Sequence, residues 1–221
     1  ILVGGTGFYV KALLDGIGLA GVPANKTVRS ELQEELERVG SAAMHERLAA
    51  VDPVSAARIH PNDAVRIIRA LEVWRVTGSP LSEISARDCV RRRPIPSVRV
   101  GLRMEMTQLD ERINERVHAM FAAGLVEEVR RLIDSGVPED APSLRGLGYR
   151  EVVAYLRGMM TLQECVQAVQ RNTRRFARRQ MTWFRADAAV QWVDVSQMFP
   201  LSVATAVMAI YDDATRRTTL P

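Results

Sequence analysis

A glycine-rich turn at residues 4–7, GGTG, is the first feature of the sequence that could bind a phosphate. It follows the apolar residues 1–3, which have the pattern of the end of a buried strand, and precedes an apolar helical stretch at 8–14. Bare backbone amides at the carboxyl edge of a parallel sheet are where α/β folds bind phosphates, and Thr6 adds a hydroxyl there. The turn matches neither GxxxxGK(S/T) nor GxGxxG, since Val10 occupies the place of the last glycine. A tight turn between a strand and a helix, without a ligand, is therefore the alternative.

Five arginines lie on one face of the helix that the sequence predicts from residue 161 to about residue 184. They recur at i, i+3, i+4, i+7 and i+8, and no acidic residue lies between Glu164 and Asp187. Charged faces in water ordinarily mix signs, because opposite charges at i,i+4 stabilise a helix. Five unpaired arginines repel one another unless a polyanion neutralises them. We therefore expect nucleic acid or polyphosphate, rather than solvent alone, on the face formed by Arg171, Arg174, Arg175, Arg178 and Arg179.

Arginines at three other places could contact a phosphate. Arg116 lies at the rim of the apolar stripe of the helix predicted at 108–123, where an arginine more often snorkels or pairs with a carboxylate. Arg66 and Arg69 share one side of another predicted helix. The loop 143–150 contains two glycines, which permit close approach, between arginines and a tyrosine ring. Each of these features is more often structural than functional.

Composition excludes several classes of protein. Hydrophobic residues make up 47% and charged residues 25% of the 221 residues, as in a folded globular chain, which excludes wholesale disorder. The longest uncharged run, 195–211, contains Pro200 and is shorter than the roughly 20 apolar residues of a membrane span. The net charge of +4 is weak support for nucleic-acid binding. Of the 30 basic residues only two are lysine, a ratio that codon bias also explains.

Several chemistries find no support in the sequence. His45, His60 and His118 are isolated, with no carboxylate or cysteine at metal-ligand spacing, so we expect no metal site among them. No GxSxG or Cys/His arrangement indicates a nucleophile, and no pair of carboxylates stands out as a general base. Cys89 and Cys165 form no CxxC pair, which favours a reduced cytoplasmic setting.

The pattern of helices and strands divides the chain into two parts. Residues 20–94 are mostly helical and have the pattern of an insertion. Strand-like alternation appears at 97–104, residues 189–193 are expected to form a last strand, and amphipathic helices lie between. We therefore expect an α/β fold that is mostly α overall, with a core made of 1–19 and 95–221 and a helical insertion domain made of 20–94.

The predicted helices follow from apolar periodicity and from caps. Gly40 separates two helices, Thr107 with Asp110 three residues later resembles a capping box, and residues 91–96 form a linker. A buried parallel strand at 1–3 needs neighbouring strands, so we expect further strands upstream and a chain that is a fragment. The predicted helices span 8–14, 26–39, 41–48, a stretch from 53, 63–76, 81–86, 108–123, 125–133, 149–156, 161–184 and 201–211.

Five blocks of sequence combine these features into a family pattern. The chain contains, in this order, VGGTGFYVKALLDG, DPVSAARIHPNDAVRIIRALEVWRVTG, RINERVHAMFAAGLVEEVRRL, SLRGLGYREVVAYLRG and TRRFARRQMTWFR. Together they closely resemble the tRNA dimethylallyltransferase family, from Ile1 to about Asp194. Five ordered blocks are far more specific than any single motif.

The resemblance implies a fold, a reaction and partners. The fold is a P-loop NTPase-like parallel sheet with helices, here incomplete, and a helical insertion domain that contacts tRNA. Members transfer a dimethylallyl group from dimethylallyl diphosphate to the N6 amine of the adenosine 3′ of the tRNA anticodon, assisted by Mg²⁺. The target base is flipped into a channel, which costs less from a loop than from a duplex. The implied partners are the tRNA anticodon stem-loop and dimethylallyl diphosphate, in a cytoplasmic monomer that contacts no membrane.

The resemblance also implies roles for individual residues, carried over by position. Gly4, Gly5 and Thr6 would hold the diphosphate, and Thr6 would lie there or beside the target base. Arg116 would neutralise diphosphate oxygens as the leaving group departs, so Thr6 and Arg116 are the implied catalytic residues. The implied tRNA contacts are Thr6, Arg29, Val65, Arg66, Ile67, Ile68, Arg69, Arg145, Gly146, Leu147, Gly148, Tyr149, Arg150, Arg174, Arg175, Arg178, Arg179, Gln180, Met181, Thr182, Trp183, Phe184 and Arg185.

Part of the family pattern has no counterpart in this chain. The family's P-loop, its catalytic aspartate and most of its Mg²⁺ ligands lie upstream of the glycine-rich turn, so we expect this chain by itself to lack transferase activity. Three other functions stay open. An adenylate isopentenyltransferase would act on a free nucleotide, which the insertion and the arginine face disfavour. A non-catalytic RNA-binding fragment would lack the diphosphate pocket, and a plain helical scaffold would bind neither ligand.

Overall fold

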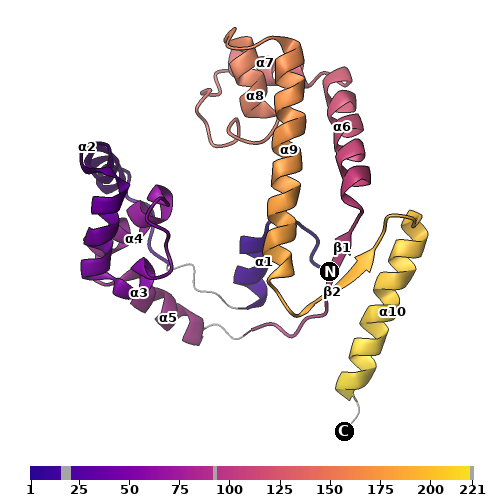
Figure 1. Ribbon diagram of the computed structural model, residues 1–221, viewed down its shortest axis with the longest axis horizontal. Helices are drawn as coiled ribbons and strands as arrows, with labels where there is room; N and C mark the ends of the chain where they lie inside the picture. The colour runs from indigo at the N-terminus through magenta and orange to yellow at the C-terminus, as the bar shows by residue number, and fades with distance from the viewer. Residues whose placement is uncertain (16–20, 92–93, 220–221) are drawn as a thin grey trace. The chain divides into compact units, whose positions relative to one another are not determined.

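The computed structural model describes residues 1–15, 21–91 and 94–219, and the chain folds as two compact units, Ile1–Ser97 and Val98–Pro221 (Figure 1). The described residues are mostly helical, with one short parallel sheet, which confirms the predicted fold class. The grouping of residues 1–19 with 95–221 in one domain stays a prediction. Within the described ranges, no helix combines the length and hydropathy that a bilayer span requires.

The first unit consists of helices whose ends follow the caps in the sequence. Asn25 and Asp63 cap two of them, each accepting a hydrogen bond from the backbone amide three residues later. Gly40, with φ 80°, interrupts the longest helix at the predicted break. The helices are α1 (Gly7–Leu14), α2 (Lys26–Val51), α3 (Pro53–Ala56), α4 (Ala64–Thr77) and α5 (Leu81–Arg91).

An apolar core between α2 and α4 holds this unit together. Leu32, Met44 and Leu48 of α2 are buried against Ile67 and Leu71 of α4. These positions recur at helical spacing, so one face of each helix is apolar. Burying one such side chain contributes about 1.5–3 kcal/mol, which makes this cluster the main source of stability in the unit.

In the second unit, the described residues form two parallel strands and five helices. Strand β1 (Arg99–Arg103) pairs with β2 (Val190–Asp194), close to the two predicted strands. Gly101 lies opposite Trp192, and a Cβ atom at residue 101 would lie 2.8 Å from the Trp192 ring. The helices are α6 (Met106–Ala122), α7 (Leu125–Asp134), α8 (Tyr149–Leu156), α9 (Leu162–Arg185) and α10 (Pro200–Thr219).

Two apolar clusters hold α6 to α9 together. Leu125 of α7, Val152 of α8 and Cys165 of α9 belong to one cluster. Val117 of α6 and Val169 of α9 belong to the other. Because α9 contributes to both clusters, its orientation is fixed against α6 on one side and against α8 on another.

Two local predictions are wrong. Residues 1–3 form no strand, and Ile1 and Val3 are exposed. The only strands in the described residues, β1 and β2, pair with each other, and residues 1–3 have no strand partner of the kind that a buried parallel strand needs. Thr107 does not cap α6. The helix begins at Met106, two residues earlier than predicted, so Glu105 is its cap and its carboxylate accepts a 3.0 Å hydrogen bond from the Gln108 amide.

Candidate nucleic-acid and diphosphate-binding surfaces

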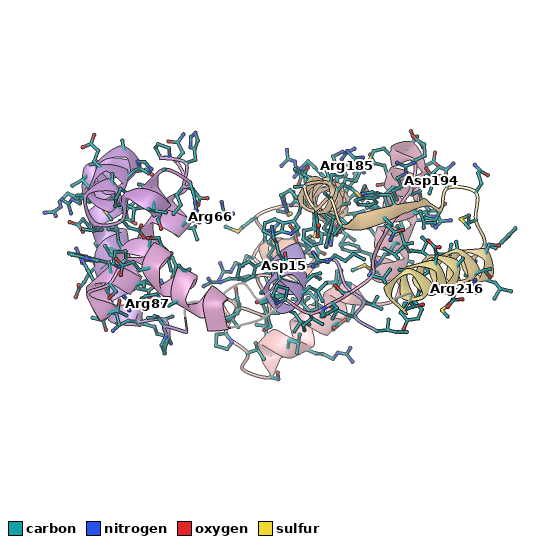
Figure 2. The ribbon with its side chains drawn as sticks, turned by 90° about the horizontal axis from the view of Figure 1, so that it is seen from below. Asp15, Arg66, Arg87, Arg185, Asp194 and Arg216 are labelled. Atoms are coloured by element: carbon teal, nitrogen blue, oxygen red, sulfur yellow. The ribbon has the colours of Figure 1, made fainter. Side chains whose placement is uncertain are left out.

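The packing of α9 fixes the direction in which its arginines point. Thr161 and Glu164 form a capping box at its start, with the Thr161 amide 2.7 Å from the Glu164 carboxylate. Cys165 and Val169 are buried. Figure 2 labels Arg185, the last residue of this helix. Four of the five arginines predicted to form one face are exposed, namely Arg171, Arg175, Arg178 and Arg179.

Two of the five arginines bond to α6. Arg178 Nη2 lies 2.7 Å from Asp110 Oδ2, and Arg174 Nη1 donates to Asn114 Oδ1 at 2.6 Å. The prediction that all five arginines are unpaired is therefore wrong for Arg178. The reason is that the acid comes from another helix, 68 residues away in the sequence, and not from α9 itself.

The other arginines of this face remain available to a ligand. Arg171 and Arg175 have no hydrogen-bond or ion-pair partner among the described residues. The guanidinium carbon of Arg179 lies 5.9 Å from the centre of the Phe176 ring, a cation–π contact that leaves its N–H groups free to turn outward. Phe176 and Trp183 are 38% and 41% exposed. At 100° per residue both rings lie on the neighbouring face of α9, on the side of Arg179. Exposed basic and aromatic side chains on one helix are typical of surfaces that bind single-stranded nucleic acid.

A buried carboxylate fixes the loop that precedes α8. Glu151 Oε2 accepts a 2.9 Å hydrogen bond from the Gly148 amide, and Oε1 accepts bonds of 2.7 Å from Arg150 Nε and 2.8 Å from Asn172 Nδ2. Burial alone would raise the pKa of Glu151, but these three hydrogen bonds outweigh it and lower the pKa. The carboxylate is therefore charged at neutral pH, and it joins the loop to α9 through Asn172.

The residues of this loop differ in how much they can offer a ligand. Arg145 and Arg150 are exposed, whereas Gly148 is buried with φ 90°, a conformation that suits glycine. Tyr149 donates a 2.5 Å hydrogen bond to Glu128, which raises the pKa of the phenol. Gly148 and Tyr149 therefore fix the backbone of the loop, and Arg145 and Arg150 are exposed on it.

Arg116 and the glycine-rich turn carry the predicted diphosphate contacts, in the second and the first unit respectively. Arg116 is exposed on α6 and has no partner among the described residues. Thr6 is the N-cap residue of α1, yet its side chain makes no capping hydrogen bond and is exposed. A Cβ atom at Gly4 would meet no atom within 4 Å, so its backbone is open to a ligand. Both predicted contacts are therefore accessible.

The predicted tRNA contacts of the first unit are only partly at its surface. Val65 is 79% exposed, and Arg66 is exposed beside Asp63, 3.3 Å away (Figure 2). Ile67 and Ile68 are 0% and 5% exposed. Their side chains fill the core next to α2, because the apolar face of α4 continues through them, so we exclude both from the proposed tRNA surface.

The chain is similar to known proteins over most of its length. Residues 1–187 match the family model described as IPP transferase. The chain belongs to the IPP transferase family. It is 49% identical over 212 residues to a tRNA dimethylallyltransferase of Geobacter sulfurreducens, covering 96% of this chain and 67% of that protein. It is 44% identical to one of Geobacter metallireducens, covering 96% of this chain and 68% of that protein. The chain thus spans about two thirds of the length of these relatives.

Solved structures of IPP transferases resemble this chain as well. A full-length tRNA isopentenylpyrophosphate transferase from Bacillus halodurans aligns with a TM-score of 0.58 and 35% identity, covering 97% of this chain and 67% of that one. A eukaryotic dimethylallyltransferase crystallised while acting on tRNA aligns with a TM-score of 0.72 over 99% of this chain and 57% of its own. At 20% identity the second likeness supports the fold alone.

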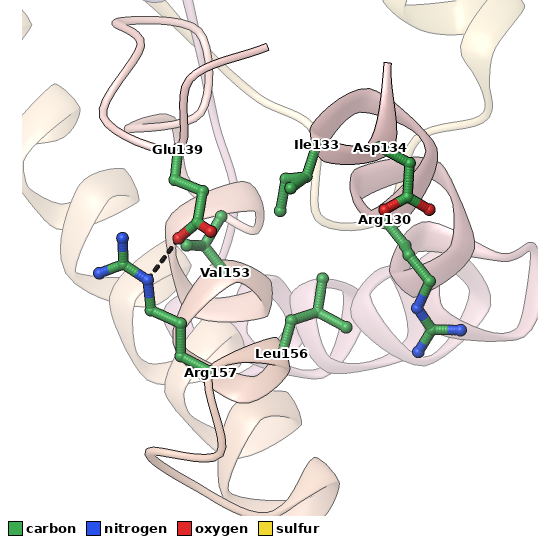
Figure 3. Close-up of a pocket in the computed structure, with 7 residues that line it drawn as sticks. All are labelled: Arg130, Ile133, Asp134, Glu139, Val153, Leu156 and Arg157. Carbon is green, nitrogen blue, oxygen red and sulfur yellow. Dashed lines mark hydrogen bonds and ion pairs between the residues drawn. The ribbon is translucent and has the colours of Figure 1, made fainter. Parts of the chain in front are cut away.

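A cavity of about 280 Å³ in this IPP transferase has none of the predicted site residues in its lining (Figure 3). It is lined by Arg130, Ile133, Asp134, Glu139, Val153, Leu156 and Arg157. Arg157 donates a hydrogen bond to Glu139 at one side of it, so two of the four charged side chains in its lining pair with each other. Its mixture of acidic and basic groups gives it no clear preference for a diphosphate.

The sequence did not indicate the residues that hold the IPP transferase arginines in place. Asp110 and Asn114 hold arginines of α9, Asn172 and Glu151 hold the loop before α8, and Glu72 holds arginines of α4 and α2. Each of these residues either lies far along the sequence from the arginine or loop that it holds, or is a polar residue whose position no nearby sequence pattern explains. The one available signal was Glu72 itself, a carboxylate placed within the apolar face of a helix.

Proposed function

We propose that this chain supplies the tRNA-binding surface and part of the diphosphate site of a tRNA dimethylallyltransferase. In this reaction the dimethylallyl group moves from dimethylallyl diphosphate to the N6 amine of the adenosine 3′ of the anticodon. The observation that carries the proposal is the exposed arginine face of α9 beside the anchored loop 145–150, both within family sequence blocks. The proposal includes a monomer in the cytoplasm and the domain division given above.

The described residues can contribute electrostatics and binding to this reaction. The amine nitrogen bonds to the allylic carbon, the bond from that carbon to the diphosphate oxygen breaks, and the nitrogen loses one proton. The guanidinium of Arg116 would neutralise the oxygens of the departing diphosphate. Gly4, Gly5 and Thr6 would offer backbone and hydroxyl donors to a diphosphate. The resemblance assigns the proton-accepting aspartate to the family pattern upstream of the glycine-rich turn.

The arginines of α9 and of the loop would hold the anticodon stem-loop. Arg171, Arg175 and Arg179 point outward, and Arg174 and Arg178 are held by α6 at fixed positions. Phosphate contacts give salt-dependent affinity, and the exposed aromatic rings would stack on unpaired bases. This division between charge and stacking suits a loop whose bases are already unstacked.

The family resemblance implies Mg²⁺, but the described residues do not supply a site for it. No group of three or more His, Cys, Asp or Glu residues in the described part of the chain is arranged to hold a metal ion. We therefore derive no step through the metal from this chain.

Filter binding tests the proposal directly. We expect the chain to bind an unmodified tRNA transcript that has adenosine 3′ of the anticodon, with an affinity that falls steeply with salt, and to bind AMP weakly. Equal affinity for AMP would favour an adenylate isopentenyltransferase. Absence of tRNA binding would favour the plain helical scaffold, which binds neither ligand.

Calorimetry with dimethylallyl diphosphate tests the diphosphate site. We expect binding that Arg116→Ala weakens about tenfold, since one charge-assisted contact contributes roughly 1.5–3 kcal/mol. Arg112→Ala, one turn earlier on α6, is the matched control and should change little. A chain that binds tRNA but not this ligand would be a non-catalytic RNA-binding module.

A further inference from the structure

Glu72 of α4 is a fully buried carboxylate that bonds two arginines and the segment before α2. Its Oε2 lies 2.8 Å from Arg29 Nη2 and 2.9 Å from Arg69 Nη1. Its Oε1 accepts a 2.8 Å hydrogen bond from the Asn25 amide. The side chain of Glu72 is 0% exposed, whereas that of Arg29 is 49% exposed. One carboxylate thus fixes the start of α2 against α4.

The two arginines have different surroundings. Arg69 is 29% exposed, and its Nη2 donates a 2.6 Å hydrogen bond to the Val22 carbonyl, so both ends of its guanidinium are used inside the unit. Arg29 uses Nη2 on Glu72, and half of its side chain faces solvent. A guanidinium has five N–H donors, so Arg29 keeps donors for a second anion.

The charge of Glu72 is secured by the same contacts. Burial alone would raise the pKa of Glu72, but the hydrogen bonds from Arg29, Arg69 and the Asn25 amide outweigh burial and lower the pKa. Two guanidinium groups and one carboxylate give this cluster a net positive charge. The cluster is therefore a fixed cation and not a neutral pair.

We propose that Glu72 is a positioning residue for tRNA binding, which holds the Arg29 guanidinium so that its remaining N–H groups face an RNA phosphate. The proposal rests on the proposed function, because it needs Arg29 to lie along the tRNA. A planar guanidinium binds phosphate best when its fork is already oriented, since less side-chain freedom is lost on binding. Glu72 itself is buried and touches no ligand.

Two possible roles of Glu72, as a negative charge near the RNA or as a residue that positions Arg29, make opposite predictions for tRNA binding. If Glu72 were only a negative charge near an RNA surface, Glu72→Gln would remove repulsion and strengthen tRNA binding. If Glu72 positions Arg29, the same change weakens binding, because an amide cannot hold two guanidinium groups. Glu72→Asp keeps the charge but is one methylene shorter and cannot reach both arginines, so positioning predicts a loss there too.

Asp52 provides a matched control in the same unit. It is 1% exposed and accepts hydrogen bonds of 2.6 Å from Ser55 Oγ and 2.7 Å from Ser82 Oγ, with no arginine partner in the described part of the chain. Asp52→Asn therefore disturbs a buried carboxylate without touching the cluster around Arg29. A purely structural role for Glu72 would make the two variants behave alike toward tRNA.

The experiment is filter binding of the 221-residue chain to an unmodified tRNA transcript, with urea unfolding of each variant at the same pH. We expect Glu72→Gln and Glu72→Asp to weaken tRNA binding at least about fivefold, and Asp52→Asn to leave it within about twofold. Arg29→Ala should cause the same loss, and adding Glu72→Gln to it should cause no further loss. Stronger or unchanged binding by Glu72→Gln would overturn the inference.

Two outcomes separate this inference from the proposed function. If the unaltered chain does not bind tRNA, the proposed function fails. If it binds and Glu72→Asp binds equally well, only the role of Glu72 fails. If the Glu72→Gln variant does not fold, the tRNA affinities of Arg29→Ala and Arg29→Lys decide the question. Both variants are suitable because the Arg29 side chain is half-exposed. Positioning predicts that lysine restores little affinity, because it lacks the fork.

Discussion

Asn172 of α9 donates a 2.8 Å hydrogen bond to the carboxylate of Glu151, 21 residues earlier at the start of α8. The same oxygen accepts a bond from Arg150, and the other oxygen accepts one from the Gly148 amide. This pair is therefore the point at which the loop 145–150 is attached to the arginine helix. Two surfaces that the sequence predicts separately are held by one buried contact.

Removal of Asn172 should loosen that attachment. Asn172→Ala leaves Glu151 short of one donor in a buried place, so we expect the free energy of unfolding to fall by about 1–3 kcal/mol in urea titrations. We also expect weaker tRNA binding, because the loop is less ordered. Gln170→Ala, which removes a side chain that bonds only to His118 at the surface, is the control. Equal effects of the two substitutions would refute the role of Asn172.

Charge reversal on α9 should separate binding from stability. Arg175→Glu alters an exposed residue without a partner in the described ranges, so we expect a loss of tRNA affinity, a salt slope lower by about 1 to 2, and a change in unfolding free energy below about 0.5 kcal/mol. Arg130→Glu, exposed on α7, should leave tRNA affinity nearly unchanged.

Arg178→Glu should affect both properties. It removes the ion pair with Asp110 and places two carboxylates together, so we expect a loss of about 1 kcal/mol in unfolding free energy in addition to weaker tRNA binding. Arg178→Glu combined with Asp110→Arg should recover stability, since the pair is restored with reversed signs. If the double variant did not recover the free energy of unfolding, the ion pair between Arg178 and Asp110 would contribute nothing to stability.

The contact between the strands should not tolerate a methyl group at residue 101. A Cβ atom there would lie 2.7 Å from Val190 Cγ1 and 2.8 Å from the Trp192 ring. We expect Gly101→Ala to lower the unfolding free energy by about 1–3 kcal/mol and to shift tryptophan fluorescence. Adding Trp192→Leu should relieve part of the loss. A Gly101→Ala chain as stable as the original would argue against this register.

Cys165 should be inert in the folded chain. Burial first, and then the charge of Glu151, raise the pKa of its thiol to about 11. At pH 8 only about one thiol in a thousand is then ionised, and the thiolate is the reactive form. We expect iodoacetamide, read out by peptide mass spectrometry in a Cys89→Ser background, to label Cys165 only after unfolding in urea. Rapid labelling without urea would show that this core opens readily.

Acid should destabilise the first unit through Asp52. Burial alone would raise the pKa of Asp52, but hydrogen bonds from Ser55 and Ser82 outweigh it and lower the pKa below its ordinary value of 3.8. A carboxyl with a lower pKa in the folded state stabilises the fold at neutral pH, and this contribution disappears as pH falls below the ordinary value. We expect the unfolding free energy of the Asp52→Asn variant to fall less than that of the original chain between about pH 5 and about pH 3. Parallel curves for the two proteins would contradict this assignment.

The positions of most helices and strands could be predicted because their causes are local. Apolar residues at helical spacing predicted α4, α6 and α9, and Gly40 marked the break in α2. Alternating residues predicted β1, and both strands lie within about two residues of the predicted ends. The strand at 1–3 failed because a buried strand depends on partners elsewhere and not on its own apolar run.

The sequence by itself determined that arginines line one side of α9, because helical spacing depends only on the order of residues. Only the tertiary structure decided which of those arginines are held and which are available. Arg178 is paired because α6 brings Asp110 beside it, and Ile68 is buried because α2 covers it. Contacts between distant segments depend on how the elements pack, and no local pattern in the chain encodes which side chains that packing brings together.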